Sequence, residues 1–163
     1  MKSNVWLSAE PSLPELISRE EDPVVCVVAG GRGLCNQTGL LLLKQLAELL
    51  HAEIVASRGA VEEGWLSAKQ MVGMSGKSIY ADIYLAFGVS GTHFHTVGIK
   101  GEPYIVAVNT NPRARFLALA KQSVNDDAQK VLRRLIDYLE ENRPNLKQMN
   151  KNEWIDMLNH AIS

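Results

Sequence analysis

The sequence predicts an α/β domain of the Rossmann-like type, with a parallel sheet between two layers of helices. Short apolar runs such as Val24–Ala29 and Tyr104–Val108 are typical of strands buried on both faces. Segments with helical spacing of leucine separate these runs, and small polar residues or glycines follow the run ends. Strands that alternate with helices favour a parallel sheet with crossover connections, and hence a three-layer nucleotide-binding fold.

The composition is that of one globular domain. The chain has 163 residues, 46% of them hydrophobic and 21% charged, which suffices for a single core. A net charge of -1 gives no sign of the excess positive charge that binds nucleic acid or an anionic membrane surface. We find no signal-peptide pattern and no apolar run near the roughly 18 residues of a membrane span. We therefore expect the cytoplasm or an equivalent reducing compartment, with Cys26 and Cys35 as reduced thiols.

Composition changes divide the chain into three expected parts. Residues 1–23 carry several prolines and an acidic run, which predicts an irregular arm or the remnant of a linker. Residues 24–143 are the expected nucleotide-binding domain. Residues 144–163 begin at a proline and are expected to form a helical tail around Trp154, Leu158 and Ala161.

The predicted elements follow from periodicity. After the first strand, Val24–Ala29, helical spacing of Leu40, Leu43, Ala47 and Leu50 predicts a helix, with Asn36 as its N-cap. The next predicted strands are Glu53–Ser57, Ile83–Phe87, Tyr104–Val108 and Phe116–Ala120. A helix is expected from about Ala128 to Glu141, with Asp127 as its N-cap and Pro144 beyond its end.

Ligand-binding residue types follow the predicted strands. Ligands of parallel α/β sheets bind beyond the carboxyl ends of the strands, which meet at one edge. The segments there are Gly30–Gly33, Ser57–Arg58, Gly88–His95 and Asn109–Pro112. Their small, hydrogen-bonding and cationic residues predict a site for an anionic ligand at this edge.

Several of these residues also have purely structural interpretations. Gly30–Gly33, with Arg32 adding positive charge, is either a phosphate-binding loop or a tight turn. It lacks the full dinucleotide fingerprint because Asn36 stands in place of the last glycine. Ser90 either binds phosphate or caps a short helix of residues 91–97. His93 and His95 do not converge on a metal at this spacing, and we expect no metal site.

Together, these motifs resemble the FAD-binding C-terminal domain of the electron transfer flavoprotein alpha subunit. The resemblance covers about Val24 to Tyr138 and needs no gaps between Gly30 and Asp127. The motifs that carry it, in order, are Gly30–Leu34, Ala56–Arg58, Ala60–Trp65, Val72–Lys77, Gly88–Gly91 with His95, and Ala107–Asn109. Several linked motifs at matching spacing are more specific than the glycine turn alone. The family's fold agrees with the α/β prediction.

The resemblance implies which residues hold the isoalloxazine end of FAD. The resemblance implies that Arg32 and Ser57 contact FAD and that Arg58 places positive charge beside the flavin ring. The residues expected to line the flavin are Val72, Gly73, Met74 and Ser75, with the Ser75 hydroxyl near flavin N5. His95 is expected at the N1 and C2-carbonyl edge. A cation and a hydrogen-bond donor there would stabilise a reduced, negatively charged flavin.

The resemblance also implies where the remainder of FAD lies. The segment expected to hold the diphosphate and reach the ring consists of Ser90, Gly91, Thr92, His93, Phe94 and His95. The residues expected at the adenosine end are Asn109, Asp127 and Ala128. The diphosphate thus goes mainly to the start of the helix after Ser90, and Arg32 marks the rim of the site.

The chain departs from the family pattern at several positions. The pattern Q-V-G-Q-T-G-K reads Met71–Lys77 here, so two amide side chains are replaced by methionine and threonine by serine. Phe94 replaces the glutamine before the family's histidine, and Ala120–Ser123 replaces A-D-Y-G. These changes remove hydrogen-bonding groups near the flavin and add apolar, polarisable ones. The family's upstream domain has no counterpart, so we expect an excised domain, a natural split form or a standalone relative.

The resemblance implies an electron carrier rather than a catalyst with a substrate of its own. It implies FAD as cofactor, an electron transfer flavoprotein beta-like subunit as partner, and flavin dehydrogenases such as acyl-CoA dehydrogenases as electron donors. Two alternatives stay open. The first is an NADP-binding enzyme domain in which Arg58 accepts the 2′-phosphate. The second is a cofactor-free interaction module that has kept the fold, which Met71, Met74 and Phe94 favour.

Overall fold

The fold is a five-stranded parallel sheet covered by helices on both faces, as the sequence predicts. The computed structural model describes residues 22–163, so nearly all of the expected arm of residues 1–23 lies outside the described residues. Within the described part, the strands lie in the order β2-β1-β4-β6-β7, and every neighbouring pair is parallel. Their bounds are β1 Cys26–Gly30, β2 Glu53–Ala56, β4 Ile83–Phe87, β6 Tyr104–Val108 and β7 Gln122–Val124.

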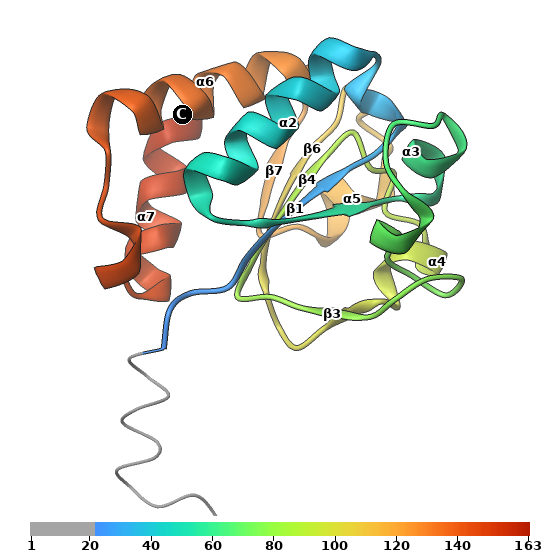
Figure 1. Cartoon of the computed structure of the whole chain (residues 1–163), viewed down its shortest axis with the longest axis horizontal. Coiled ribbons are helices and arrows are strands. Elements are labelled where there is room, and N and C mark those ends of the chain that lie inside the picture. The colour runs from blue at the N-terminus through green and yellow to red at the C-terminus, as the bar shows by residue number, and fades with distance from the viewer. Residues whose placement is uncertain (1–21) are drawn as a thin grey trace, which may run out of the picture.

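One face of the sheet is covered by the long helices α2 (Gln37–Leu50) and α6 (Ala128–Asn142) (Figure 1). Both predicted N-caps are confirmed: Asn36 accepts a hydrogen bond from the Gly39 amide, and Asp127 accepts one from Lys130. Helix α6 ends at Asn142, before Pro144, as expected. Helix α7 (Lys151–Ile162) adds Trp154 and Leu158 to the same core. The C-terminal residues therefore share the main core rather than forming a separate one.

The opposite face is covered by shorter elements. They are α4 (His93–Thr96), α5 (Arg115–Leu119) and a small parallel pair of β3 (Ile79–Tyr80) with β5 (Ile99–Lys100). The short helix α3 (Arg58–Glu62) instead packs its Ala60 into the core on the side of the long helices. Short 3-10 turns lie at Arg32–Leu34, Ala68–Gln70 and Leu146–Gln148. Alternate residues of one strand serve the two faces: Val28 packs on the long-helix side and Val27 on the other. This explains why the strands are continuous apolar runs.

Two predicted strands are corrected by the structure. The first strand is Cys26–Gly30, shifted from the expected Val24–Ala29. The run Phe116–Ala120 is wrong as a strand, because residues 115–119 form helix α5 and the last strand is Gln122–Val124. A short apolar run cannot be assigned from periodicity alone. Here Phe116 is fully buried while Leu119 is exposed, which fits one turn of helix lying on the sheet.

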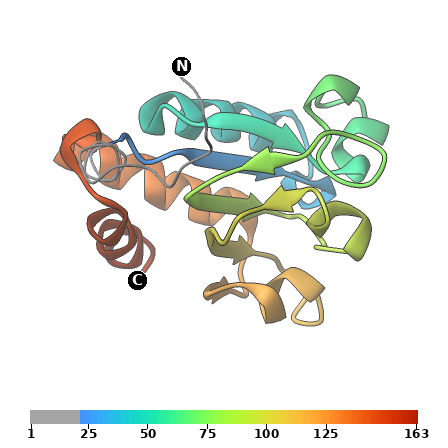
Figure 2. The ribbon, with the colours of Figure 1, turned by 90° about the horizontal axis from the view of Figure 1, so that it is seen from below.

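The parallel strands bring the segments that follow them to one edge. Helices α3 and α4 lie at this edge, and α7 lies at the opposite end of the sheet (Figure 1, Figure 2). The Gly33 amide donates to the Gly88 carbonyl at 3.0 Å, so the loops after β1 and β4 are in direct contact. The fold thus assembles the predicted ligand-binding segments on one side of the molecule.

Candidate functional site

A cavity of about 230 Å³ lies at the carboxyl edge of the sheet. Ten of the residues predicted from the sequence line it: Arg32, Ser57, Arg58, Val72, Met74, Ser75, Ser90, Thr92, Phe94 and His95. Sequence reasoning did not assign four other lining residues to the ligand: Met71, Gly59, Gly88 and Val89. Because Gly88 and Val89 directly follow β4, their position was visible in the sequence as part of the strand-end segment.

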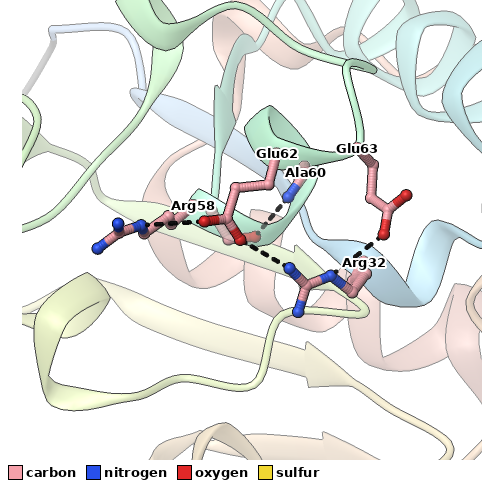
Figure 3. Close-up of polar contacts among 6 residues, drawn as sticks. Arg32, Arg58, Ala60, Glu62 and Glu63 are labelled. Carbon is pink, nitrogen blue, oxygen red and sulfur yellow. Dashed lines mark hydrogen bonds and ion pairs between the residues drawn. The ribbon is translucent and has the colours of Figure 1, made fainter.

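One wall of the cavity carries two arginines that are paired with carboxylates. Glu62 Oε1 lies 2.8 Å from Arg32 Nη2, and Glu62 Oε2 lies 3.3 Å from Arg58 Nε (Figure 3). Glu63 Oε1 lies 3.4 Å from Arg32 Nε. The formal charges of these four side chains sum to zero. The sequence led us to expect unpaired positive charge at Arg32. This expectation is corrected, because Glu62 and Glu63 balance the charge of the arginines.

Arg58 and Glu62 lie on the short helix α3, and Arg32 reaches them from the 3-10 turn after β1. Ser57 caps this helix by accepting a hydrogen bond from the Ala60 amide at 3.3 Å. The cap fixes the start of the helix, and Arg58 and Glu62 lie four residues apart on one face. The arginine side chains remain 60% and 74% exposed, so an anionic ligand can reach both of them. Exposed ion pairs of this kind are weak and exchange readily for charge-assisted bonds to phosphate.

A second wall is apolar and carries the residues that replace family amides. Met74 and Phe94 are 57% and 64% exposed although both are large and apolar. The Met74 amide donates to the Phe94 carbonyl at 2.6 Å, which fixes the 71–77 loop against α4. Gly73 permits this approach, because its φ of +134° is in the glycine region and a Cβ there would collide with the Phe94 carbonyl. A flat aromatic ring fits beside such a wall.

His95 also lines the cavity and is almost completely buried. It is 5% exposed, and its Nε2 lies 2.8 Å from the Tyr84 hydroxyl. Burial lowers the pKa of His95 to about 4, and the Val72 backbone opposes this lowering in part. The imidazole is therefore neutral at pH 7. Among residues 22–163, no group forms a well-aligned hydrogen bond to its Nδ1 atom.

The remaining predicted residues lie outside this cavity. Gly91 and His93 line a wider, shallower hollow of about 790 Å³ on the other side of α4, together with Arg113 and Arg115. Ser90 is not the N-cap of this helix: Thr92 precedes α4, without a side-chain cap, and the helix spans only residues 93–96. Gly73 lies within the loop of the apolar wall. The diphosphate segment is thus divided between two hollows.

The residues expected at the adenosine end lie at the same sheet edge, but they make structural contacts. Asn109 donates to the Val89 carbonyl at 3.2 Å and accepts from the Asn111 amide at 2.9 Å. Asp127 caps α6, and Ala128 is buried. None of these three residues lines the cavity. Cys26 is buried and Cys35 exposed, both as free thiols.

The donor set fits a ligand that combines an anionic group with an aromatic ring. The two arginines and the Ser57, Ser90 and Thr92 hydroxyls suit phosphate, and the Met74–Phe94 wall suits a ring. His95 also lines the cavity, and its Nδ1 is a buried polar atom without a hydrogen-bond partner among residues 22–163. Within residues 22–163, we find no cluster of His, Cys, Asp and Glu that could hold a metal ion. No helix in that part is both long and apolar enough to cross a membrane.

Comparison with known families agrees with this chemistry. Residues 22–100 match the family described as the electron transfer flavoprotein FAD-binding domain. Among individual proteins, the chain is similar to "Protein FixB" of Azotobacter vinelandii, with 42% identity over 106 residues, which are 65% of this chain and 29% of that protein.

Two proteins named electron transfer flavoprotein subunit alpha are similar over a longer stretch. The protein of Thermoanaerobacterium thermosaccharolyticum is 34% identical over 131 residues, which cover 80% of this chain and 39% of that protein. The protein of Syntrophomonas wolfei is 33% identical over 138 residues, which cover 84% of this chain and 44% of that protein. The chain therefore spans less than half the length of these curated relatives.

Proposed function

The chain is an electron transfer flavoprotein alpha-like protein, and from that premise we propose that it binds FAD at the cavity beyond β1, β2 and β4. The observation that carries this proposal is the lining of the cavity. Two arginines, three hydroxyls, an exposed apolar pair and the imidazole of His95 line the same cavity. The cavity of about 230 Å³ is smaller than typical ligand sites, so part of FAD lies along the open sheet edge.

The bound FAD supplies the electron-transfer chemistry, and the chain's residues bind and tune it. Arg32 and Ser57 contact the cofactor, and Arg58 lies beside the isoalloxazine ring. Ser90 and Thr92 hold the diphosphate. Positive charge and a hydrogen-bond donor near the ring favour its reduced, more negative form. Because Glu62 offsets part of that charge, the potential depends on the balance between the arginines and the carboxylates.

The partners follow from the same relationship. We propose that a beta-like subunit covers the exposed side of the cofactor and that flavin dehydrogenases such as acyl-CoA dehydrogenases deliver the electrons. We also propose a cytoplasmic location, since the relatives come from bacteria. Co-purification with an electron transfer flavoprotein beta-like subunit tests the pairing. Failure of the two purified proteins to associate in the presence of FAD would contradict it.

The NADP alternative is less well supported. Arg58 is the residue that would accept a 2′-phosphate, and it is paired with Glu62 on its own helix. A competition experiment separates the two ligands: quenching of FAD fluorescence by the protein should persist in a large excess of NADP. Displacement of FAD by NADP at similar concentration would favour the alternative.

A further inference from the structure

The contact between Tyr84 and His95 links the centre of the sheet to the cavity. Tyr84 lies on β4, and its hydroxyl is 2.8 Å from Nε2 of His95 on α4. Phe116 completes a buried aromatic cluster, with ring centroids 5.8 Å from His95 and 6.1 Å from Tyr84. The imidazole is therefore held from the core side by a rigid strand.

The hydrogen bond between Tyr84 and His95 can run in either direction, and the available partners favour one of the two directions. If Nε2 carried the ring proton, it would donate to Tyr84, and the tyrosine hydrogen would have no acceptor among residues 22–163. Nδ1 would then also be a buried acceptor without a donor. If the Tyr84 hydroxyl donates to Nε2, only the Nδ1 proton remains, and it faces the Val72 backbone. The second arrangement leaves fewer buried groups unsatisfied, and such groups are costly.

The ionisation states agree with this inventory. Burial lowers the pKa of His95 to about 4, and burial raises the pKa of the Tyr84 hydroxyl above its usual value. At pH 7 the pair therefore holds two protons, one on the phenol and one on the imidazole. Because Nε2 accepts from the phenol, the imidazole proton belongs on Nδ1.

We propose that Tyr84 is a positioning residue that fixes the tautomer of His95, so that the buried Nδ1 carries a proton directed at the Val72 backbone. Val72 and His95 both line the cavity, so this contact holds the 71–77 loop against α4 at the ligand-binding surface. The tautomer assignment does not depend on any cofactor, whereas its effect on flavin binding rests on the proposed function.

Nitrogen-15 NMR of the histidine-labelled chain tests the tautomer without any cofactor. At pH 7 we expect a protonated Nδ1 and an unprotonated Nε2 for His95 in the wild type. Tyr84→Phe should shift the tautomer population towards protonated Nε2. Tyr104→Phe is the matched control, since the Tyr104 hydroxyl also makes a hydrogen bond, to Asn159 at 3.2 Å. A protonated Nε2 in the wild type would overturn the proposal, whether or not the variants fold.

FAD titration tests the consequence. Tyr84→Phe should raise the FAD dissociation constant roughly 3- to 10-fold, as expected for the loss of one hydrogen bond, and Tyr104→Phe should leave it unchanged. An unchanged constant in Tyr84→Phe, with the tautomer shifted, would overturn the positioning role. A chain that takes up no FAD at all would contradict the proposed function and leave the NMR result valid.

Discussion

The Glu62 carboxylate lies 2.8 Å from Arg32 and also reaches Arg58 at 3.3 Å, so one acidic side chain bridges the two arginines of the cavity. Arg32 and Glu62 are 30 residues apart in the sequence and meet because β1 and β2 are neighbours. The bridge holds the guanidinium groups in place while offsetting their charge. An anionic ligand must compete with Glu62 for them.

Removal of the bridging charge should strengthen FAD binding. We expect Glu62→Gln to lower the FAD dissociation constant by up to about five-fold at low salt, the range of an exposed ion pair, with a smaller effect at high salt. Glu63→Gln is the comparison: within residues 22–163 Glu63 pairs with Arg32 alone, at 3.4 Å, so its effect should be smaller. Flavin fluorescence quenching measures both constants. Weaker binding in Glu62→Gln would show that the carboxylate orients the arginines more than it competes for them.

The buried imidazole should make the fold sensitive to mild acid. An unfolded histidine is protonated below about pH 6.5, whereas folded His95 resists protonation down to about pH 4. The unfolded state therefore binds more protons in this window, and stability falls as the pH drops from 6.5 to 4. The loss is at most about 3 kcal/mol.

Urea unfolding between pH 7 and pH 4 measures this loss. His95→Gln should show a smaller decline in the free energy of unfolding than the wild type. His93→Gln serves as the matched control, since it removes an exposed histidine from the same short helix. Parallel declines in the wild type and in His95→Gln would rule out His95 as the group responsible.

The backbones of Gly88 and Gly33 pack closely together beside the cavity. Gly88 has a φ of +68°, and a Cβ at this position would collide with the backbone of Gly33. Gly88→Ala should therefore cost more than 2 kcal/mol of stability. Gly64→Ala is a control for backbone strain alone, because its φ is +80° but nothing lies within 4 Å of the added Cβ. It should cost about 1 kcal/mol, and equal losses at the two positions would refute the close contact.

Helix α7 should contribute to the stability of the whole fold. Trp154 is 2% exposed and belongs to the same core as the sheet residues. Trp154→Ala should destabilise the chain by about 3–5 kcal/mol in a single cooperative transition. Asp156→Ala, at an exposed position on the same helix, should have little effect. An independent, early transition of α7 with an unchanged main transition would contradict this expectation.

The strands and long helices could be predicted because local sequence and tertiary packing agree there. Val27 and Val28 face opposite layers, and Asn36 and Asp127 cap their helices by local hydrogen bonds. The segment around Phe116 could not be assigned from the sequence. Its helix, α5, forms where the Phe116 ring packs against Tyr84 and Gly91. That contact depends on the folded sheet rather than on local propensity.

The position of the site was also predictable, but its electrostatics were not. The parallel sheet brings Arg32, Ser57 and Ser90 to one edge, as expected from the strand ends. The Arg58–Glu62 pair has the i,i+4 spacing of a helical ion pair and was a readable signal. The Arg32–Glu62 contact and the Tyr84–His95 contact required the folded geometry.

The most direct test of the central claim is the visible spectrum of the chain purified without added cofactor, followed by identification of what it releases on denaturation. We expect a yellow protein that releases FAD at close to one per chain, or a colourless one that takes up FAD to that ratio. A colourless protein that takes up no FAD would contradict the proposed function.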